Sequence, residues 1–196
     1  PYEEAAAALV PLLVSRTETV RRLAFESIAA HAGSSFLDRL PELLRHRDPT
    51  VVHAALDWLR RNPSERNLSL VSEALDSPSP AVRAKAFSIV EATSSPRVVP
   101  FALKGLEDQE EGLRYRAVQL LTRFPDESAI GPLLRHCHLD STRIQDAAIS
   151  ALTPLLARSD IRWNEDLIPL LSDANPRVRQ LASRILRTQE PQRVAE

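Results

Sequence analysis

Apolar residues recur along the chain in six copies of one pattern. In each copy an apolar residue, here called the anchor, precedes an alanine by four positions, which is about one helical turn. The six pairs are Val20/Ala24, Val51/Ala55, Val82/Ala86, Leu113/Ala117, Ile144/Ala148 and Val178/Ala182. Successive anchors lie 31 residues apart through the first five copies and 34 residues apart at the last. A fixed period between about 20 and 50 residues predicts a stacked array of helical repeats.

The columns around the anchor predict two helices in each copy. Apolar residues seven and eleven positions before the anchor form the stripe of a first helix, and those four, five and eight positions after it form the stripe of a second helix. The pattern predicts an all-α, right-handed α-solenoid of about six two-helix repeats, stabilised by stacking. The predicted repeats cover approximately residues 3–32, 34–62, 64–93, 95–124, 126–158 and 164–188, in a single array over 1–196.

Polar residues three positions before the anchor mark the predicted start of each second helix. They are Thr17, Asp48, Ser79, Glu110, Ser141 and Asn175, and all but Glu110 have a short side-chain oxygen that can accept from free helix N–H groups. Pro154 falls late in the fifth second helix, where we expect a bend or an early end and then an irregular connection. Trp163 lies in that connection and is expected either to pack over the bend or to contact a partner.

The copies resemble the HEAT repeat, especially the short bacterial form of the phycobilisome-lyase type. The shared motif is Leu-x-x-x-Leu, then Asp or Ser with Pro, then Val-Arg-x-x-Ala, and the best copies are Leu75–Val90 and Leu167–Leu186. The resemblance covers about residues 5–188. It implies second helices that line a concave side and a role as a scaffold for protein assembly, although some family members are enzymes.

Two features suggest a piece excised from a longer protein. The chain begins with Pro1, and neither the first nor the last copy has a clear polar capping helix, which terminal repeats normally need. We expect further repeats or another domain on at least one side. Uncapped ends could also mediate self-association.

Composition limits the function classes. The net charge of −1 argues against the broad cationic surface of a nucleic-acid-binding protein. No apolar stretch approaches the about 20 residues of a membrane helix, and no signal peptide opens the chain. The single cysteine, Cys137, excludes an internal disulfide and fits a reducing, cytoplasmic compartment. Only Lys85 and Lys104 among the 25 cationic residues are lysines, which suggests a GC-rich, bacterial genome.

The second helices present a polar face that is predicted to bind a partner on the concave side. The candidate partner-binding residues are Arg22, His53, Asp57, Arg60, Lys85, Tyr115, Arg116, Gln119, Arg123, Arg184 and Arg187. Cations outnumber anions on this face, although the whole chain is slightly acidic, so an acidic peptide or helix is the favoured partner. The alternative is an ordinary solvated face.

A row of arginines stands one position after the anchor. It consists of Arg21, Arg83, Arg114 and Arg179. Such a row could bind a phosphate or an acidic tail. The favoured interpretation is structural, with each arginine bridging to acidic residues of the turns within repeats, such as Asp76, Asp108, Asp140 or Asp173.

No cofactor, metal site or catalytic residue is predicted. In His136-Cys137-His138 the two histidines point about 100° to either side of the cysteine on a helix, so the three side chains do not converge on a metal. The sequence thus predicts a non-catalytic protein-interaction module that binds a protein or peptide, without nucleic-acid binding or membrane insertion. A HEAT-like enzyme or enzyme subunit, related to bilin lyases or DNA glycosylases, stays open, as does a regulatory cytosolic domain fused to a transporter or nucleotide-sensing protein.

Overall fold

The computed structural model describes residues 8–32, 40–46, 48–62, 65–156 and 167–189. All regular structure in these residues is helical, which confirms the predicted all-α solenoid class. The chain divides into two compact units, Pro1–Val98 and Val99–Glu196, here called unit 1 and unit 2. That all six repeats form one array over residues 1–196 stays a prediction.

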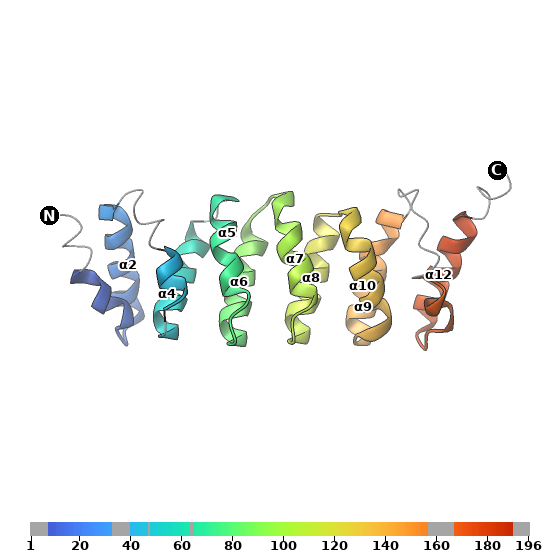
Figure 1. Cartoon of the computed structure of the whole chain (residues 1–196), viewed down its shortest axis with the longest axis horizontal. Helices are drawn as coiled ribbons and strands as arrows, with labels where there is room; N and C mark the ends of the chain where they lie inside the picture. The colour runs from blue at the N-terminus through green and yellow to red at the C-terminus, as the bar shows by residue number, and fades with distance from the viewer. Residues whose placement is uncertain (1–7, 33–39, 47, 63–64, 157–166, 190–196) are drawn as a thin grey trace. The chain divides into compact units, whose positions relative to one another are not determined.

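Unit 1 contains the first three repeats. Its described elements, with η for a 3-10 helix, are η1 (Val10–Val14), α2 (Glu18–Ala32), a helical stretch over 40–44, α4 (Pro49–Arg61), α5 (Glu65–Ala74), α6 (Pro80–Ala92) and η2 (Pro96–Val98). The second helices pack in sequence, α2 against α4 and α4 against α6 (Figure 1). The first helix α5 packs against α6, its partner in the third repeat.

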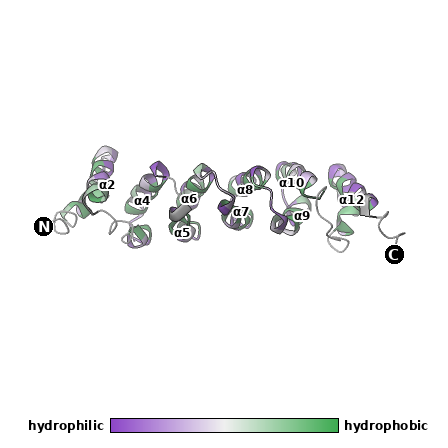
Figure 2. Ribbon diagram, turned by 90° about the horizontal axis from the view of Figure 1, so that it is seen from above, coloured by the Kyte–Doolittle hydropathy of each residue, from purple (hydrophilic) through white to green (hydrophobic). Residues whose placement is uncertain are grey.

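Unit 2 contains the last three repeats. Its described elements are α7 (Val99–Leu106), α8 (Glu111–Arg123), η3 (Glu127–Ala129), α9 (Ile130–Leu139), α10 (Thr142–Leu156), η4 (Pro169–Ser172) and α12 (Pro176–Gln189). First and second helices pair as α7 with α8 and α9 with α10, and η4 packs on α12. The second helices α8, α10 and α12 form one layer of this unit, and α7 and α9 lie in the other (Figure 2).

Equivalent columns of the repeats lie in one environment, the space between the two helix layers. The anchors Val51, Val82 and Leu113 are at most 4% exposed, and all six alanines of the column four positions later are buried. Val20, in the first repeat, is only half-buried. A buried aliphatic side chain contributes roughly 1.5–3 kcal/mol relative to an exposed one, so these repeated columns are the main source of stability. The alanines leave room for the helices to approach closely.

The first helices of the end repeats are less regular than the columns predict. Their described residues form mainly the 3-10 turns η1 and η4 in place of α-helices. Pro11 and Pro169 stand at the start of these turns. Proline removes a backbone donor and crowds the preceding turn, and short 3-10 segments tolerate this better than a long α-helix does.

The start signals expected for the second helices hold at some repeats and fail at Ser79. Asp48 and Asn175 accept from the backbone N–H two residues later, at 2.8 Å and 2.9 Å, and so cap their helices as predicted. The Ser79 and Glu110 side chains make no such capping bond. The helix α10 includes Pro154 and extends to Leu156, two residues beyond it, and a bend at the proline stays a prediction. The connection that follows, including Trp163, lies outside the described residues.

Candidate partner-binding face

The four arginines of the row make the same contact in their repeats. In each, one terminal guanidinium nitrogen donates to two successive backbone carbonyls of the turn that precedes the second helix. The N···O distances are 2.7 and 3.1 Å for Arg21, 3.1 and 3.4 Å for Arg83, 2.9 and 3.0 Å for Arg114, and 2.7 and 2.9 Å for Arg179. The acceptors common to the row are therefore backbone carbonyls of the turn between the two helices, which the sequence did not suggest.

The same turns carry a second shared contact. The side chain five positions before the anchor accepts from the backbone N–H two residues later, as Ser77 does from Ser79, Asp108 from Glu110 and Asp173 from Asn175. In the third repeat, for example, this bond pairs the backbone N–H of Ser79, and Arg83 pairs the carbonyls of Ser77 and Pro78. Sequence reasoning missed the motif, although an oxygen-bearing residue six positions before the arginine recurs in four repeats.

Arg114 also links two repeats within unit 2. Its Nε and Nη2 atoms donate to the two carboxylate oxygens of Asp140 at 2.7 and 2.9 Å. Asp140 is the C-cap of α9, only 6% of its side chain is exposed, and His136 Nδ1 lies 3.1 Å from its Oδ2 atom. The guanidinium lowers the pKa of Asp140 to about 2, aided by the Ser141 N–H and opposed by burial.

In unit 1 the candidate partner-binding residues are engaged with one another. Asp57 on α4 accepts from Lys85 Nζ on α6 at 2.7 Å, and Arg60 Nε lies 3.9 Å from its other oxygen. Burial lowers the pKa of the nearby His53, and the positive charge of Lys85 adds to this effect while Asp57 opposes it. His53 is therefore a neutral side chain beside an ion pair at neutral pH.

A second acid in unit 1, Glu26, also pairs with cations of the candidate face and its neighbours. Glu26 on α2 lies 3.2 Å from Arg22 on the same helix and 3.7 Å from Arg61 on α4. A small hollow of about 50 Å³ between these helices is lined by Glu18, Arg21, Arg22, Ala54, Asp57, Arg60 and Arg61. Arg22, Arg60 and Arg61 each lie within 4 Å of a carboxylate of their own unit.

In unit 2 the central candidate, Tyr115 on α8, is covered by another residue of the same unit. The guanidinium of Arg143 on α10 stacks 3.8 Å from the ring centroid, and Gln119 donates to the phenol oxygen at 3.1 Å. Arg123 stacks 5.1 Å from the ring of Phe124. Such contacts hold the aromatic rings in place, and Arg123 keeps an exposed side chain.

Of the remaining candidates of unit 2, Arg116 is half-buried on α8, and Arg184 and Arg187 lie on α12. Arg184 and Arg187 are exposed, and Arg184 donates to the Thr153 hydroxyl at 3.3 Å. Asp146 lies 3.0 Å from Arg177. A groove of about 420 Å³ is lined by Asp146, Ile149, Ser150, Thr153, Arg177, Gln180, Leu181 and Arg184. A further hollow of about 500 Å³ is lined by Pro176, Arg179, Gln180, Ser183, Arg184 and Arg187.

Sequence reasoning missed Arg143 and Arg177 as members of this face. Both stand one position before the anchor, which is three positions before a face residue and so one helical turn away on the same side. The sequence contains the signal, because arginine replaces an uncharged residue at this column in the last two repeats. The other four repeats carry Thr19, Thr50, Ala81 and Gly112 there. Only the last two repeats extend the face with arginine.

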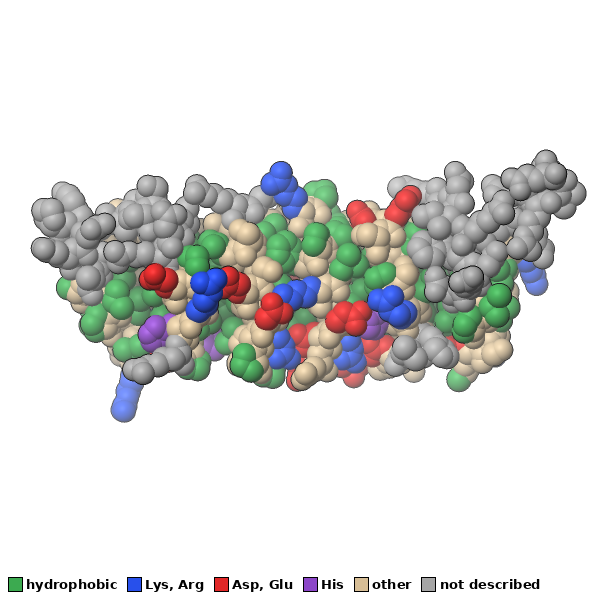
Figure 3. All heavy atoms as spheres, viewed as in Figure 1, with side chains coloured by type: hydrophobic (Ala, Val, Ile, Leu, Met, Phe, Trp, Pro, Cys, Tyr) green, Lys and Arg blue, Asp and Glu red, His purple; other side chains and the backbone are tan. Residues whose placement is uncertain are grey.

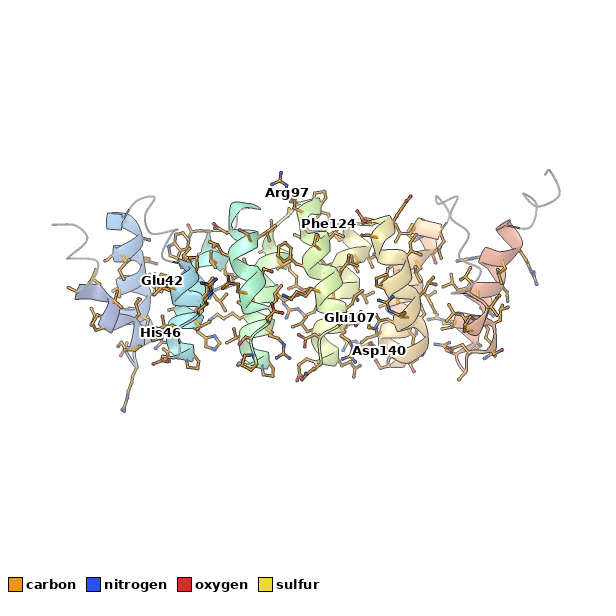
Figure 4. The ribbon with its side chains drawn as sticks, viewed as in Figure 1. Glu42, His46, Arg97, Glu107, Phe124 and Asp140 are labelled. Carbon is orange, nitrogen blue, oxygen red and sulfur yellow. The ribbon has the colours of Figure 1, made fainter. Side chains whose placement is uncertain are left out.

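The side formed by the first helices differs from the second-helix face. Acidic and basic side chains lie beside one another there (Figure 3). In unit 1, Arg45 Nε lies 2.6 Å from Glu73, and in unit 2, Arg135 lies 3.4 Å from Glu107, which Figure 4 labels on this side. These pairs join neighbouring repeats and leave little net charge for a ligand.

Exposed large apolar residues gather near the ends of the described chain. They are Val10, Leu12, Val14 and Leu23 in unit 1 and Ile168 and Leu171 in unit 2. Interior counterparts in the same columns, such as Leu134 and Cys137, are at most 2% exposed. Self-association through these surfaces stays a prediction.

The described residues contain no group of three or more His, Cys, Asp or Glu side chains that could hold a metal. Cys137 is buried, and burial raises the pKa of its thiol to about 12, so it is not a nucleophile at neutral pH. Within the described helices, none has both the length and the apolar character needed to cross a bilayer.

The chain matches the family model for HEAT repeats twice, over residues 6–86 and 67–153. No curated protein sequence matches it. Among solved structures, the designed armadillo repeat protein YIII(Dq)4CqI is similar with 17% identity and a TM-score of 0.49, over 93% of this chain and 98% of that one. An engineered protein is similar with 18% identity and a TM-score of 0.48, over 95% and 97%.

A third similar chain comes from a structure concerned with TOG–tubulin binding specificity. It shares 12% identity, with a TM-score of 0.47 over 97% of this chain and 86% of that one. The two family-model matches together span well over half of the sequence and coincide with the repeats seen in the fold. The chain belongs to the HEAT-repeat family.

Proposed function

We propose that this chain is a non-catalytic protein-interaction module that binds an acidic peptide or helix on the face of its second helices. Folds of the HEAT type commonly serve as scaffolds for protein interaction. The observation that carries the proposal is the pair of exposed arginines Arg184 and Arg187 on α12, a helix with four arginines and no acidic residue.

The alternative partners fit less well. A nucleic acid needs phosphate contacts spread over a cationic surface, and in unit 1 Asp57 and Glu26 neutralise the face. A catalytic role needs convergent reactive groups, and the buried thiol of Cys137 and the paired Asp57 do not supply them. The same proposal includes a bacterial cytoplasm as the location, because the single cysteine fits a reducing compartment and the scarcity of lysine fits a GC-rich genome.

A charge-reversal experiment tests the face. The face variant changes Arg60, Arg123 and Arg184 to Glu, and the control variant changes Arg45, Arg97 and Arg135 to Glu, so both change the net charge equally. Each is presented with phage libraries of acidic and of basic helical peptides. We expect wild type and the control to capture acidic peptides, and the face variant to lose them, because cation-to-anion changes turn attraction into repulsion.

Three results would contradict the proposal. One is a preference of wild type for basic peptides, and another is equal capture by the face and control variants. The third is tight binding of duplex DNA with a steep dependence on salt, or a bound pigment visible by absorption, since these favour the glycosylase-like and lyase-like alternatives. Circular dichroism melts establish that both variants are folded.

A further inference from the structure

We infer that the groove between α10 and α12 is the site where unit 2 takes an acidic peptide segment that carries one apolar side chain. The inference rests on the proposed function and specifies its site and ligand. The groove has a volume of about 420 Å³ and opens on the second-helix face. Its walls come from two packed helices of the same unit.

The groove lies where the repeat packing is interrupted. Five positions after the anchor, the side chains Phe25, Leu56, Phe87 and Val118 are fully buried, whereas Ile149 in the same column is only half-buried. This is the boundary at which the anchors are 34 residues apart and not 31. Ile149 thus leaves part of an apolar surface open, and Leu181 from α12 lies beside it in the groove wall. One aliphatic or aromatic side chain of a ligand can cover that surface.

The charges around the groove select an acidic ligand. The helix α12 carries Arg177, Arg179, Arg184 and Arg187 and no acidic residue. The acid of the groove wall, Asp146, pairs through Oδ2 with Arg177 at 3.0 Å, so the charge of Arg177 balances it. Arg179 is committed to the carbonyls of its own turn. Arg184 and Arg187 are the cations left for a ligand.

Arg184 stands at the centre of the site because it lines both the groove and the adjoining hollow of about 500 Å³. Gln180 lines both as well and can bond to a peptide backbone. An extended or helical segment that places its apolar side chain on Ile149 therefore has carboxylates within reach of two exposed guanidinium groups. Guanidinium–carboxylate pairs can be bidentate, which adds direction to the charge attraction.

Two measurements test the site. Phage-displayed random 12-residue peptides are selected for binding to the intact chain, and the affinity of a selected peptide is then measured by fluorescence anisotropy. We expect selected peptides to contain several Asp or Glu residues around one Leu, Ile or Phe. Arg184→Glu with Arg187→Glu should weaken binding about tenfold or more, and Arg22→Glu with Arg60→Glu in unit 1 should leave it within about twofold. Replacing the apolar residue of the peptide by serine should also weaken binding about tenfold, without any change to the protein.

The outcomes separate this inference from the proposed function. If acidic peptides bind and the Arg22/Arg60 variant weakens them while the Arg184/Arg187 variant does not, the face is right and this site is wrong. If the serine-substituted peptide binds as tightly as its parent, the apolar part of the inference is wrong. If no acidic peptides are selected, both the site and the proposed function fail.

Discussion

Unit 1 and unit 2 use one helical position in opposite ways. Six positions after the anchor, unit 1 carries the acids Glu26 and Asp57 on α2 and α4 and Ser88 on α6. Unit 2 carries Gln119, Ser150 and Arg184 on α8, α10 and α12. In unit 1 each acid gathers cations from its own and a neighbouring helix. In unit 2 this position supplies no acid, and Arg184 and Arg187 are exposed to solvent.

The difference shows that the net charge of a surface depends on whether acids lie beside its cations, and not only on the number of cations. Lys85 and Arg60 of unit 1 would look like binding residues in a count of charges, but Asp57 holds them in ion pairs. A ligand would have to break those pairs to reach them. The open groove and the exposed Arg184 and Arg187 occur together in unit 2, and this coincidence is why we propose the binding surface there.

The largest expected effect concerns the contact between Arg114 and Asp140, which connects two repeats of unit 2. We expect Asp140→Asn to lower the free energy of unfolding by about 2 kcal/mol at neutral pH, because it removes the carboxylate that Arg114 holds in two short contacts. The pKa of Asp140 falls from 3.8 to about 2 in the folded state, so its contribution is full above about pH 4 and is lost as pH falls toward 2.

Urea denaturation between pH 2 and pH 7 measures this effect, and the variant should lose the part of the acid sensitivity that Asp140 supplies. Cys137 gives a second readout, because its buried thiol should react with thiol reagents only when unit 2 opens, and the variant should react faster. Glu107→Gln, in an exposed pair, is the control. Equal stability of D140N and wild type at pH 7 would show that the turn does not hold the repeats.

The fold could be predicted from the sequence, and most of the site could not. Burial repeats with the period of the anchors, so Val51, Val82 and Leu113 reveal their common environment in the sequence itself. The partners of Arg83 or Arg179 are backbone carbonyls, which no side-chain pattern records.

Pairing across helices was equally hidden. That Asp57 meets Lys85, or that Arg143 covers Tyr115, depends on which rotamers face each other across a helix boundary. The groove beside Ile149 depends on how α12 sits after a longer interval between anchors. The sequence shows the interval of 34 residues but not the opening that accompanies it.

A smaller effect is expected from removing the central acid of unit 1. Asp57→Asn should lower the free energy of unfolding by about 0.5–1 kcal/mol, since Asp57 and Lys85 are both about three-quarters buried and 2.7 Å apart. It should also lower the pKa of His53 further, because Asp57 is the group that opposes Lys85 there. Denaturation and NMR titration of His53 measure the two effects. Glu73→Gln, in an exposed pair of the same unit, should change stability less, and an unchanged His53 titration in D57N would contradict the assigned network.

The smallest change in stability, and the sharpest test of the comparison, comes from giving unit 2 the acid it lacks. Ser150→Glu places a carboxylate at the column of Asp57, in the wall of the groove that Arg184 also lines. An exposed pair of this kind should alter stability by no more than about 0.5 kcal/mol. It should weaken the acidic peptide about tenfold, because the arginine gains a partner within the protein and the groove loses positive charge.

Ser150→Gln is the matched control, since it adds a side chain of the same length without the charge. If S150E and S150Q weaken the peptide equally, the loss comes from filled space and the charge argument fails. If only S150E weakens it, and added salt narrows the gap between the two variants, the missing acid at this column is what opens unit 2 to an acidic ligand.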